Sequence, residues 1–453
     1  MNVHFIAIGG AAMHNLALAL HQQGHKISGS DDQVFEPSKS RLANEGLLPK
    51  KEGWFPEKIT LAIDTVILGM HAKPDNPELK KAMELNIPTY SFPEFLYQQT
   101  KNKKRVVIGG SHGKTTITSM IMHVMRAQNI AFDYMVGAQL EGFKTMVGFS
   151  DHSQIALFEG DEYLSSPLDK QSKFLHYHAD IAVINGIAWD HINVFPTFES
   201  YLDTFAKFIA QLPAKGKLFY YQHDVHLKNL LSKVPTKVTT TPYTRVNYSA
   251  AEEGYQVHSE NKTYNVSLFG QHNMQNMEAA HNVCSELGIA SDDFFTAMQS
   301  FRGAARRLET VDTKAPIKIF RDFAHAPSKV KATVEAVREM YPSKQIMAIL
   351  ELHTYSSLTK RFLKDYQHTL SDAEQALVYF NPHTLKIKQL PPISSQEIKE
   401  AFGRDDILVY NDSKDLASRL IAAQKNPPDV VLLMSSGNFD NLNIPLLLEQ
   451  RAD

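Results

Sequence analysis

The stretch RVVIGGSHGKTTITSMIMHVM, residues 105–125, decides the fold of this chain. An apolar run leads into a glycine-rich turn and then into an amphipathic helical pattern, so it predicts a strand, a tight turn and a helix. The glycines allow backbone N–H groups to approach an anion, and the new helix presents its positive N-terminus. Lys114 adds a point charge and Thr115 offers a hydroxyl for Mg²⁺. The segment therefore predicts a phosphate-binding loop that takes ATP or GTP.

The loop matches a short form of the phosphate-binding motif. A strict P-loop carries a glycine five places before Gly113, where this chain has Ile108, so the match is to the pattern GxxGK[ST]. The alternative is an ordinary strand-to-helix turn with a surface lysine, and the segment alone leaves that alternative open.

Length, charge and cysteine content bound the class of protein. The 453 residues are too many for one core and suggest three domains. A formal net charge of −2 gives no field that attracts nucleic acid or an anionic membrane, so we expect small-molecule partners. The single cysteine, Cys284, allows no internal disulfide and no cysteine metal cluster, which fits a cytoplasmic protein. The sequence contains no run of about 18 apolar residues, so we do not predict a membrane span. The oligomeric state is not predicted.

Short β-branched runs alternate with helical patterns along most of the chain, which predicts an α/β protein with mainly parallel sheets. The lysine-rich stretch TKNKK, residues 100–104, marks a boundary before the phosphate-binding strand. We predict a Rossmann-like N-terminal domain at 1–103, a P-loop-type central ATPase domain at 104–311 and a Rossmann-like C-terminal domain at 312–453. In the last domain, helices are expected to begin near Pro327, Leu358, Ser394, Ser413 and Asn443.

Acidic residues follow the next apolar strand after the loop. Residues 154–158 lead directly into Glu159, Asp161 and Glu162. The carboxyl edge of a parallel sheet would bring these side chains beside the phosphate-binding loop. Carboxylates suit Mg²⁺ there, because this ion takes one or two protein oxygens and completes its shell with water and phosphate. The alternative is a solvated acidic turn.

Two further polar pairs follow strands or open helices. Asp190 and His191 come after the strand in DIAVING, but a lone histidine is more often a structural residue than a ligand, and position alone does not decide. Asn273 and Asn276 would share one helix face, where amides can bind the edge of adenine. Asparagine is also a preferred helix cap, so capping remains the alternative.

Near the second predicted boundary, Arg306 and Arg307 present guanidinium groups that can stabilise charge on a transferred phosphoryl group, although surface arginines are ordinary. Asp322 and His325 then end a strand just before a helix that starts at Pro327. The carboxylate there can hold ribose hydroxyls or take part in a capping turn, and the sequence does not separate the two.

The N-terminal stretch IAIGGAAM imitates a dinucleotide fingerprint with too few glycines. It follows a strand and opens a helix, and Asp31 ends the next strand about twenty residues on. Ala7 and Ala12 stand where glycine is expected, so NAD binding is only weakly supported. A nucleotide diphosphate on the helix N-terminus is the alternative.

Taken together, the segments GSHGKTT, EGDEY, the Asp-His pair, HNxxN, ARR and DFAHAP resemble, in order and spacing, those of the Mur ligases, the ADP-forming enzymes of bacterial cell-wall synthesis. The resemblance covers the whole chain. The segments IGG, GHKISGSD and DNPE are similar to the branch that uses UDP-N-acetylmuramate. The segment DKQSKFLHY, residues 169–177, and the segment LELHTYSSLTKRF resemble the recycling branch, which attaches L-Ala-γ-D-Glu-meso-diaminopimelate instead of L-alanine.

The resemblance implies a three-domain enzyme that uses ATP and Mg²⁺ and forms an acyl phosphate on the lactyl carboxylate of UDP-N-acetylmuramate. Lys114, His191 and Arg307 are implied as catalytic, and Thr115, Glu159 and His191 as metal ligands. ATP is implied to contact Gly110, Ser111, His112, Gly113, Lys114, Thr115, Thr116, Asn273, Asn276, Arg307, Asp322 and His325. The UDP-sugar is implied to contact Gly9, Gly10, Met13 and Asp31.

The chain departs from the family pattern in places. Phe205 stands where some branches carry a carbamylated lysine, with Lys207 offset, so we do not predict that modification. Ala326 replaces the second of two consecutive histidines. Two rival hypotheses remain: the L-alanine-adding ligase, and a non-catalytic binding protein switched by a nucleotide.

Overall fold

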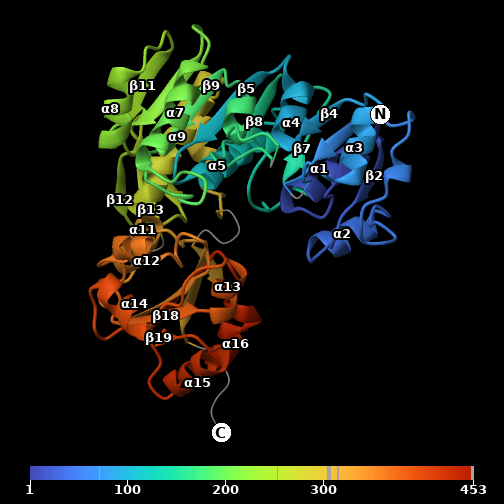
Figure 1. Ribbon diagram of the computed structural model, residues 1–453. Helices are drawn as coiled ribbons and strands as arrows, with labels where there is room; N and C mark the ends of the chain where they lie inside the picture. Colours follow the sequence, from blue (N-terminus) through green and yellow to red (C-terminus); the bar gives the residue numbers. More distant parts are fainter. Residues whose placement is uncertain (71, 167, 252–253, 304–307, 314–315, 450–453) are drawn as a thin grey trace. The chain divides into compact units, whose positions relative to one another are not determined.

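The computed structural model describes residues 1–70, 72–166, 168–251, 254–303, 308–313 and 316–449 (Figure 1). The chain divides into two compact units, and each is described by itself. The first comprises Met1–Ile187, Phe198–Thr244 and Met277–Met298. The second comprises Ala188–Thr197, Arg245–Asn276 and Gln299–Asp453.

The first unit begins with a parallel four-stranded sheet in the order β2-β1-β3-β4. Helix starts here follow local capping rules: Asn76 accepts hydrogen bonds from the first turn of the helix that starts at Pro77, and Glu94 in the first turn of the next helix accepts the N–H of Ser91. The predicted Rossmann-like N-terminal domain is confirmed. Its elements are β1 (Asn2–Ile6), α1 (Ala11–Gln22), β2 (Lys26–Ser30), α2 (Ser38–Asn44), η1 (Pro56–Lys58), β3 (Thr65–Leu68), α3 (Pro77–Glu84), β4 (Thr89–Ser91) and α4 (Phe92–Thr100).

A seven-stranded sheet in the order β11-β10-β9-β5-β8-β6-β7 follows in the same unit, with every neighbouring pair parallel except β6 and β7. The strand before the phosphate-binding loop, β5, lies between β8 and β9, so the carboxyl ends of these three strands meet at one edge. The elements are β5 (Lys104–Gly109), α5 (Lys114–Ala127), β6 (Asp133–Met135), β7 (Val147–Gly148), β8 (Ile155–Glu159), α6 (Lys173–His176), β9 (Ile181–Ile184), α7 (Phe198–Ala210), β10 (Lys217–Tyr221), α8 (Val225–Lys233) and β11 (Thr239–Tyr243). Two later helices are α9 (Gln271–Glu286), whose residues from Met277 onward belong to this unit, and α10 (Ser291–Met298), which packs against α5.

The second unit holds two sheets. A three-stranded antiparallel sheet consists of β12 (Tyr248–Ala250), β13 (Tyr255–Ser259) and β14 (Lys262–Val266). A six-stranded sheet has the order β15-β16-β20-β17-β18-β19 and is parallel except for β15. The elements around it are β15 (Glu309–Val311), β16 (Lys318–Asp322), α11 (Pro327–Met340), β17 (Ile346–Leu352), α12 (Lys360–Leu363), η2 (Lys364–Tyr366), β18 (Gln375–Phe380), α13 (Pro382–Ile387), α14 (Ser395–Phe402), β19 (Leu408–Tyr410), α15 (Ser413–Ala423), β20 (Val430–Met434), η3 (Phe439–Asn441) and α16 (Ile444–Glu449).

Helices cover both faces of the six-stranded sheet, as Figure 1 shows. Strand β17 is buried along its whole length, with alternate residues in two separate cores. One core includes Val334 of α11 and Phe402 of α14, and the other includes Leu420 of α15 and Leu448 of α16. A strand buried on both faces is an uninterrupted apolar run, as the sequence IMAIL of this strand is.

Several elements differ from the prediction. The helix expected near Leu358 begins at Lys360 and has four residues, because the preceding residues form a hydrogen-bonded turn in which Thr354 bonds Ser357. The elements that were not predicted include strands β4, β6, β7, β10 and β15 and helices α2, α4, α6, α8, α10 and α13. Strand β15 pairs with β16, so the C-terminal sheet begins ahead of the boundary predicted at residue 312. None of the helices in the described ranges has the length and apolarity needed to cross a membrane.

Candidate functional site

The loop between β5 and α5 has the backbone of a phosphate cradle. Gly110 and Gly113 adopt positive φ angles of 116° and 70°, and Gly113 is the N-cap of α5. A Cβ on Gly110 would lie 2.7 Å from the backbone nitrogen of Asn185, and the N–H of Ser111 donates to the carbonyl of Gly186 at 3.0 Å. The loop is therefore held against the residues that follow β9, with its turn open to the N-terminus of α5.

Lys114, the first residue of α5, lies in a buried network. Its Nζ donates to Glu162 Oε2 at 2.6 Å and to the carbonyl of Gly110 at 2.8 Å. The hydroxyl of Tyr201, from α7, donates to Glu162 Oε1 at 2.9 Å and lies 2.9 Å from Ser111 Oγ. Burial alone would lower the pKa of Lys114, but the carboxylates of Glu162 and Asp161 outweigh burial and raise that pKa. The ammonium group is therefore charged at neutral pH and held beside the loop.

Thr115 and Glu159 lie together, as the carboxyl edge of the sheet predicts. The Thr115 hydroxyl donates to Glu159 Oε1 at 2.8 Å, and the N–H of Gly137 donates to Glu159 Oε2 at 2.6 Å. Both side chains are at least nine-tenths buried. The pair offers the two hard oxygen donors that Mg²⁺ prefers, so these residues fit the metal that the sequence predicts here.

The three acidic residues after β8 separate into different roles. Glu162 pairs with Lys114, whereas Asp161 pairs with Lys173 at 2.6 Å. Glu159 accepts the hydrogen bond from the hydroxyl of Thr115. The spacing of the acidic residues did not predict which carboxylate pairs with which lysine. It also did not predict the hydrogen bond from Tyr201, a residue 39 positions after Glu162 whose only sequence signal is its place on the apolar face of a helix.

For the other loop residues, the predicted contacts with ATP remain predictions. The carbonyl of His112 accepts a hydrogen bond from Asn185 Nδ2 at 3.2 Å, and Thr116 is buried within α5. Phe205 packs edge-on against Phe174 and Tyr201. Lys207 is exposed and pairs with Asp203.

In the second unit, the Asp-His pair and the DFAHAP segment come together. Lys329 Nζ lies 3.3 Å from Asp190 Oδ2, and the N–H of His191 donates to Asp190 Oδ1 at 2.8 Å. Burial would raise the pKa of Asp190, but Lys329, His191 and His325 outweigh burial and hold that pKa far below its usual range. Burial and the charge of Lys329 lower the pKa of His325 to about 4. His191 itself has a positive φ of 55°.

The two asparagines of HNxxN lie inside α9 and not at its cap, because the helix begins at Gln271. Asn273 Nδ2 donates to the carbonyl of Phe269 at 2.7 Å, and Asn276 Nδ2 donates to Asn273 Oδ1 at 3.2 Å. Both side chains are buried. The shared face that the spacing predicts is confirmed, and the capping alternative is wrong.

Asp322 ends β16, where the sequence predicts a ribose-binding carboxylate. Its oxygens accept hydrogen bonds from the N–H of Leu308 at 2.6 Å, the N–H of Ala324 at 2.7 Å and, at 3.3 Å, the hydroxyl of Thr333. It also borders a cavity of about 160 Å³ together with Ser435. The carboxylate therefore stabilises its own turn. This is the capping role that the sequence left open beside ribose binding. Arg306 and Arg307 lie outside the described residues.

The N-terminal loop brings Asp31 to the glycines. Asp31 Oδ2 accepts the N–H of Gly9 at 2.7 Å, whereas Oδ1 is buried without a hydrogen-bond partner among the described residues. Burial, with the neighbouring Asp32, raises the pKa of Asp31 to about 6. Ala7 adopts a positive φ of 69°, so an alanine takes the backbone conformation expected of the missing glycine. Gly10 caps α1, and Met13 lies buried in its first turn.

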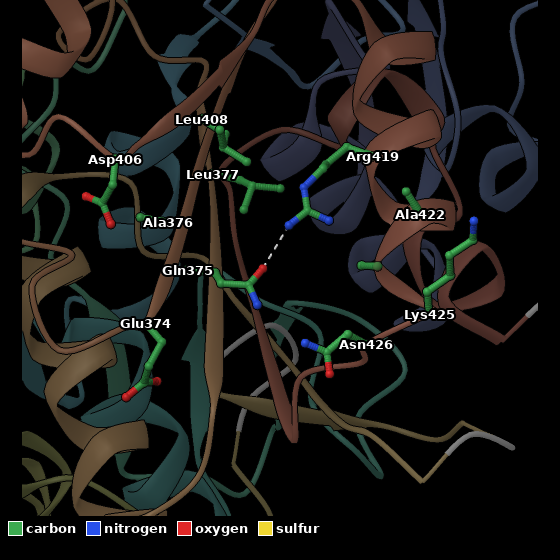
Figure 2. A pocket seen from close by; sticks show the side chains of 11 residues that line it. Glu374, Gln375, Ala376, Leu377, Asp406, Leu408, Arg419, Ala422, Lys425 and Asn426 are labelled. Atoms are coloured by element: carbon green, nitrogen blue, oxygen red, sulfur yellow. Dashed lines mark hydrogen bonds between the residues drawn. The ribbon is translucent and has the colours of Figure 1, made fainter.

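Another cavity in the second unit lies away from these residues. It has a volume of about 380 Å³ and is bordered by the starts of β18 and β19 and by α15 (Figure 2). Arg419 Nη2 donates to Gln375 Oε1 across it at 2.9 Å. Ligands of open parallel sheets bind at the carboxyl ends of strands, and this cavity lies at the amino ends. We therefore do not assign it to the substrate.

Three family models together match almost the whole chain: "Mur ligase family, catalytic domain" at residues 2–104, "Mur ligase middle domain" at 108–284 and "Mur ligase, glutamate ligase domain" at 306–437. Among curated relatives, the UDP-N-acetylmuramate–L-alanine ligase of Caldicellulosiruptor bescii is 32% identical, covering 83% of this chain and 82% of its own. The enzyme of the same name from Aquifex aeolicus is 27% identical, covering 96% and 95%.

Solved structures share the fold along the whole chain. A murein peptide ligase from Psychrobacter arcticus aligns with a TM-score of 0.69 at 21% identity, covering all of both chains. The UDP-N-acetylmuramate–alanine ligase of Thermotoga maritima aligns with a TM-score of 0.71 at 19% identity, covering 99% of this chain and 98% of that one. With its phosphate cradle, its three matched domains and these relatives, the chain belongs to the Mur ligase family of ATP-dependent, amide-forming ligases.

Proposed function

We propose that this ligase joins the lactyl carboxylate of UDP-N-acetylmuramate to the free amine of L-Ala-γ-D-Glu-meso-diaminopimelate, with conversion of ATP to ADP and phosphate. The reaction would return a murein tripeptide to peptidoglycan precursors. The observation that carries the proposal is the segment DKQSKFLHY at 169–177. Its Lys173 pairs with Asp161, which directly precedes the Lys114 partner Glu162 in the chain, so the segment is tied to the phosphate cradle.

The groups at the cradle suit the first step. The lactyl carboxylate attacks the γ-phosphorus of ATP, ADP leaves and an acyl phosphate forms. The charged Lys114 would leave Glu162 and neutralise the transferred phosphoryl oxygens, and no proton need move from it. Thr115 and Glu159 would hold Mg²⁺, which shields phosphate charge when bound. Arg307 and His191 are proposed to face the same phosphates.

In the second step, the peptide amine attacks the acyl carbon, and the tetrahedral intermediate expels phosphate and a proton. We propose that the third domain binds the peptide at the carboxyl ends of β17 and β20. There Glu351 is buried, accepts the N–H of Phe439 at 2.9 Å and is bonded by the hydroxyl of Ser435. Asn273 and Asn276 are proposed to bind adenine, and Gly9, Gly10, Met13 and Asp31 the UDP group.

The second candidate is the L-alanine-adding activity, which the names of the curated relatives favour. An assay of ADP release separates the two. The full-length enzyme is incubated with UDP-N-acetylmuramate, ATP and Mg²⁺, and either L-alanine or the tripeptide is added. Release that depends on the tripeptide supports the proposal, and release that depends on alanine supports the second candidate. No release with either acceptor would favour the non-catalytic hypothesis.

A further inference from the structure

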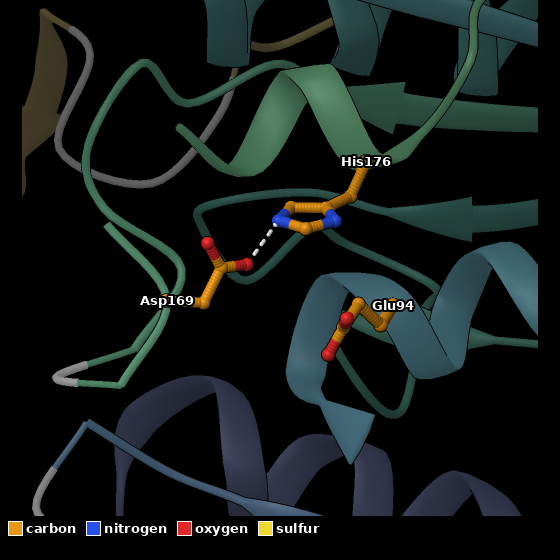
Figure 3. Close-up of side chains that lie close together, drawn as sticks. All are labelled: Glu94, Asp169 and His176. Carbon is orange, nitrogen blue, oxygen red and sulfur yellow. Dashed lines mark ion pairs between the residues drawn. The ribbon is translucent and has the colours of Figure 1, made fainter. Parts of the chain in front are cut away.

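A second group of ligand-type side chains lies away from the cradle. Glu94, Asp169 and His176 each place one ligand atom within 4.8 Å of the other two (Figure 3). We propose that these three residues bind a divalent transition-metal ion of the Zn²⁺ class. The site shares no residue with the predicted magnesium ligands.

The three residues come from separate segments of the first unit. Glu94 lies in the first turn of α4, Asp169 in the loop before α6, and His176 at the end of α6. Helix α4 packs against α6, which brings the segments together. A metal ion here would join the helix of the N-terminal domain to the loop that follows Glu162.

Backbone groups orient both carboxylates. The N–H of Ser91 donates to Glu94 Oε2 at 2.7 Å, and the N–H of Gln171 donates to Asp169 Oδ1 at 2.9 Å. The second oxygen of Glu94 is thereby left for a metal ion, and the second oxygen of Asp169 faces His176. Such outer hydrogen bonds are the usual means of fixing metal ligands before the ion binds.

The remaining contact in the group already brings two of the three ligand atoms together. His176 Nε2 lies 2.6 Å from Asp169 Oδ2, yet this buried nitrogen has no aligned hydrogen bond in the part of the chain that the structure describes. The His176 side chain is 11% exposed. A shared cation would bind both atoms along their lone pairs.

The charge of the group also favours a cation. Two carboxylates outnumber one imidazole, so the net charge is negative whether or not His176 is protonated. Within the described ranges, neither carboxylate forms an ion pair with a lysine or an arginine. A divalent ion would therefore bind where no fixed positive side chain competes.

The donor set selects the kind of ion. One imidazole nitrogen with two carboxylate oxygens suits Zn²⁺ and its neighbours, whereas Mg²⁺ and Ca²⁺ prefer oxygen donors alone. Bonds of about 2.0–2.2 Å to a tetrahedral ion place the ligand atoms roughly 3.5 Å apart. The three ligand atoms lie within 4.8 Å of one another, and the 2.6 Å contact between His176 Nε2 and Asp169 Oδ2 would have to widen to admit the ion. Water would supply the fourth ligand.

The test is binding of Zn²⁺ alone to the full-length, metal-stripped protein in the presence of a competing chelator. Three variants are compared: Glu94→Gln, His176→Gln and, as the matched control, His152→Ala, which removes an exposed histidine of the same unit. Glu94→Gln keeps an oxygen for the N–H of Ser91, so the bond at the start of the helix survives. Circular dichroism without metal checks that each variant is folded.

We expect wild type and His152→Ala to bind one tight equivalent of Zn²⁺. Glu94→Gln and His176→Gln should each bind that equivalent at least about 10- to 100-fold more weakly, since even loss of an outer-shell partner costs that much. Co²⁺ in place of Zn²⁺ should give visible absorption that both variants lose. Equal Zn²⁺ affinity in all four folded proteins, or no tight equivalent in wild type, would overturn the proposal.

Discussion

The ion pair between Lys114 and Glu162 predicts that stability and catalysis can be separated by mutation. Lys114→Met removes the charge that faces Glu162, a carboxylate whose side chain is 1% exposed. Removing one partner of a buried pair costs about 3–5 kcal/mol. The Lys114 side chain is 14% exposed and Tyr201 still donates to Glu162, so we expect the lower end, about 3 kcal/mol. For a domain of this size the melting temperature should fall by roughly 6–12 °C.

The double variant Lys114→Met with Glu162→Gln should recover most of that loss, because it leaves no buried charge and the oxygen of the new amide can still accept the Tyr201 hydrogen bond. Turnover should behave differently. Both the single and the double variant should lose at least about 100-fold in kcat, the usual cost of removing one group that stabilises transition-state charge.

The measurements are differential scanning calorimetry without nucleotide and ADP release with UDP-N-acetylmuramate and the tripeptide. Glu162→Gln alone completes the thermodynamic cycle, and Lys114 there keeps its bond to the carbonyl of Gly110. The reasoning on stability is refuted if Lys114→Met melts at the wild-type temperature. A Lys114→Met enzyme with wild-type turnover would remove the cradle from the mechanism.

Three further predictions address the remaining groups. Thr115→Val removes a donor to Glu159 and should raise the Mg²⁺ concentration for half-maximal ADP release at least about tenfold, whereas Thr115→Ser should not; equal requirements in all three enzymes would exclude Thr115 as a ligand. Asp322→Asn leaves one oxygen for the N–H groups of Leu308 and Ala324 and should cost about 1–3 kcal/mol in urea unfolding; an unchanged midpoint would show that the turn does not depend on the carboxylate. Because the pKa of Asp31 is about 6 in the folded protein and lower in the unfolded chain, its contribution to stability is lost as pH rises from about 4 through 6. The difference in melting temperature, Asp31→Asn minus wild type, should therefore become more positive as the pH is raised from about 4.5 to about 7.5. A difference that is constant with pH would contradict the assignment.

Local patterns predicted the parts of the fold that local physics determines. The apolar run and glycines at 105–113 predicted β5, the cradle and α5, and the alternation of apolar runs with helical patterns predicted the mainly parallel sheets. Strands that depend on a distant partner were missed. Strand β7 has two residues held by β6, and β15 has three residues paired with β16. The short run KLFYY at 217–221 carried a strand signal that the prediction overlooked.

The sequence predicted those site residues whose location follows from the strand or helix end on which they lie. Thr115 and Glu159 were placed together because both lie at the carboxyl edge of parallel strands. Which of two nearby carboxylates faces Lys114 depends on side-chain direction in the turn after β8, and spacing does not specify that direction. The contact of Tyr201 depends on how α7 packs, which no local pattern contains.

The close fit of Gly110 against the main chain at Asn185 and Gly186 limits how this enzyme can change. The inner wall of the turn is peptide backbone, so exchanging side chains there cannot widen it or narrow it. Selection for another nucleotide would have to act through groups that meet the base or the sugar. Inhibitors directed at this turn would in turn meet few routes to resistance inside the turn itself.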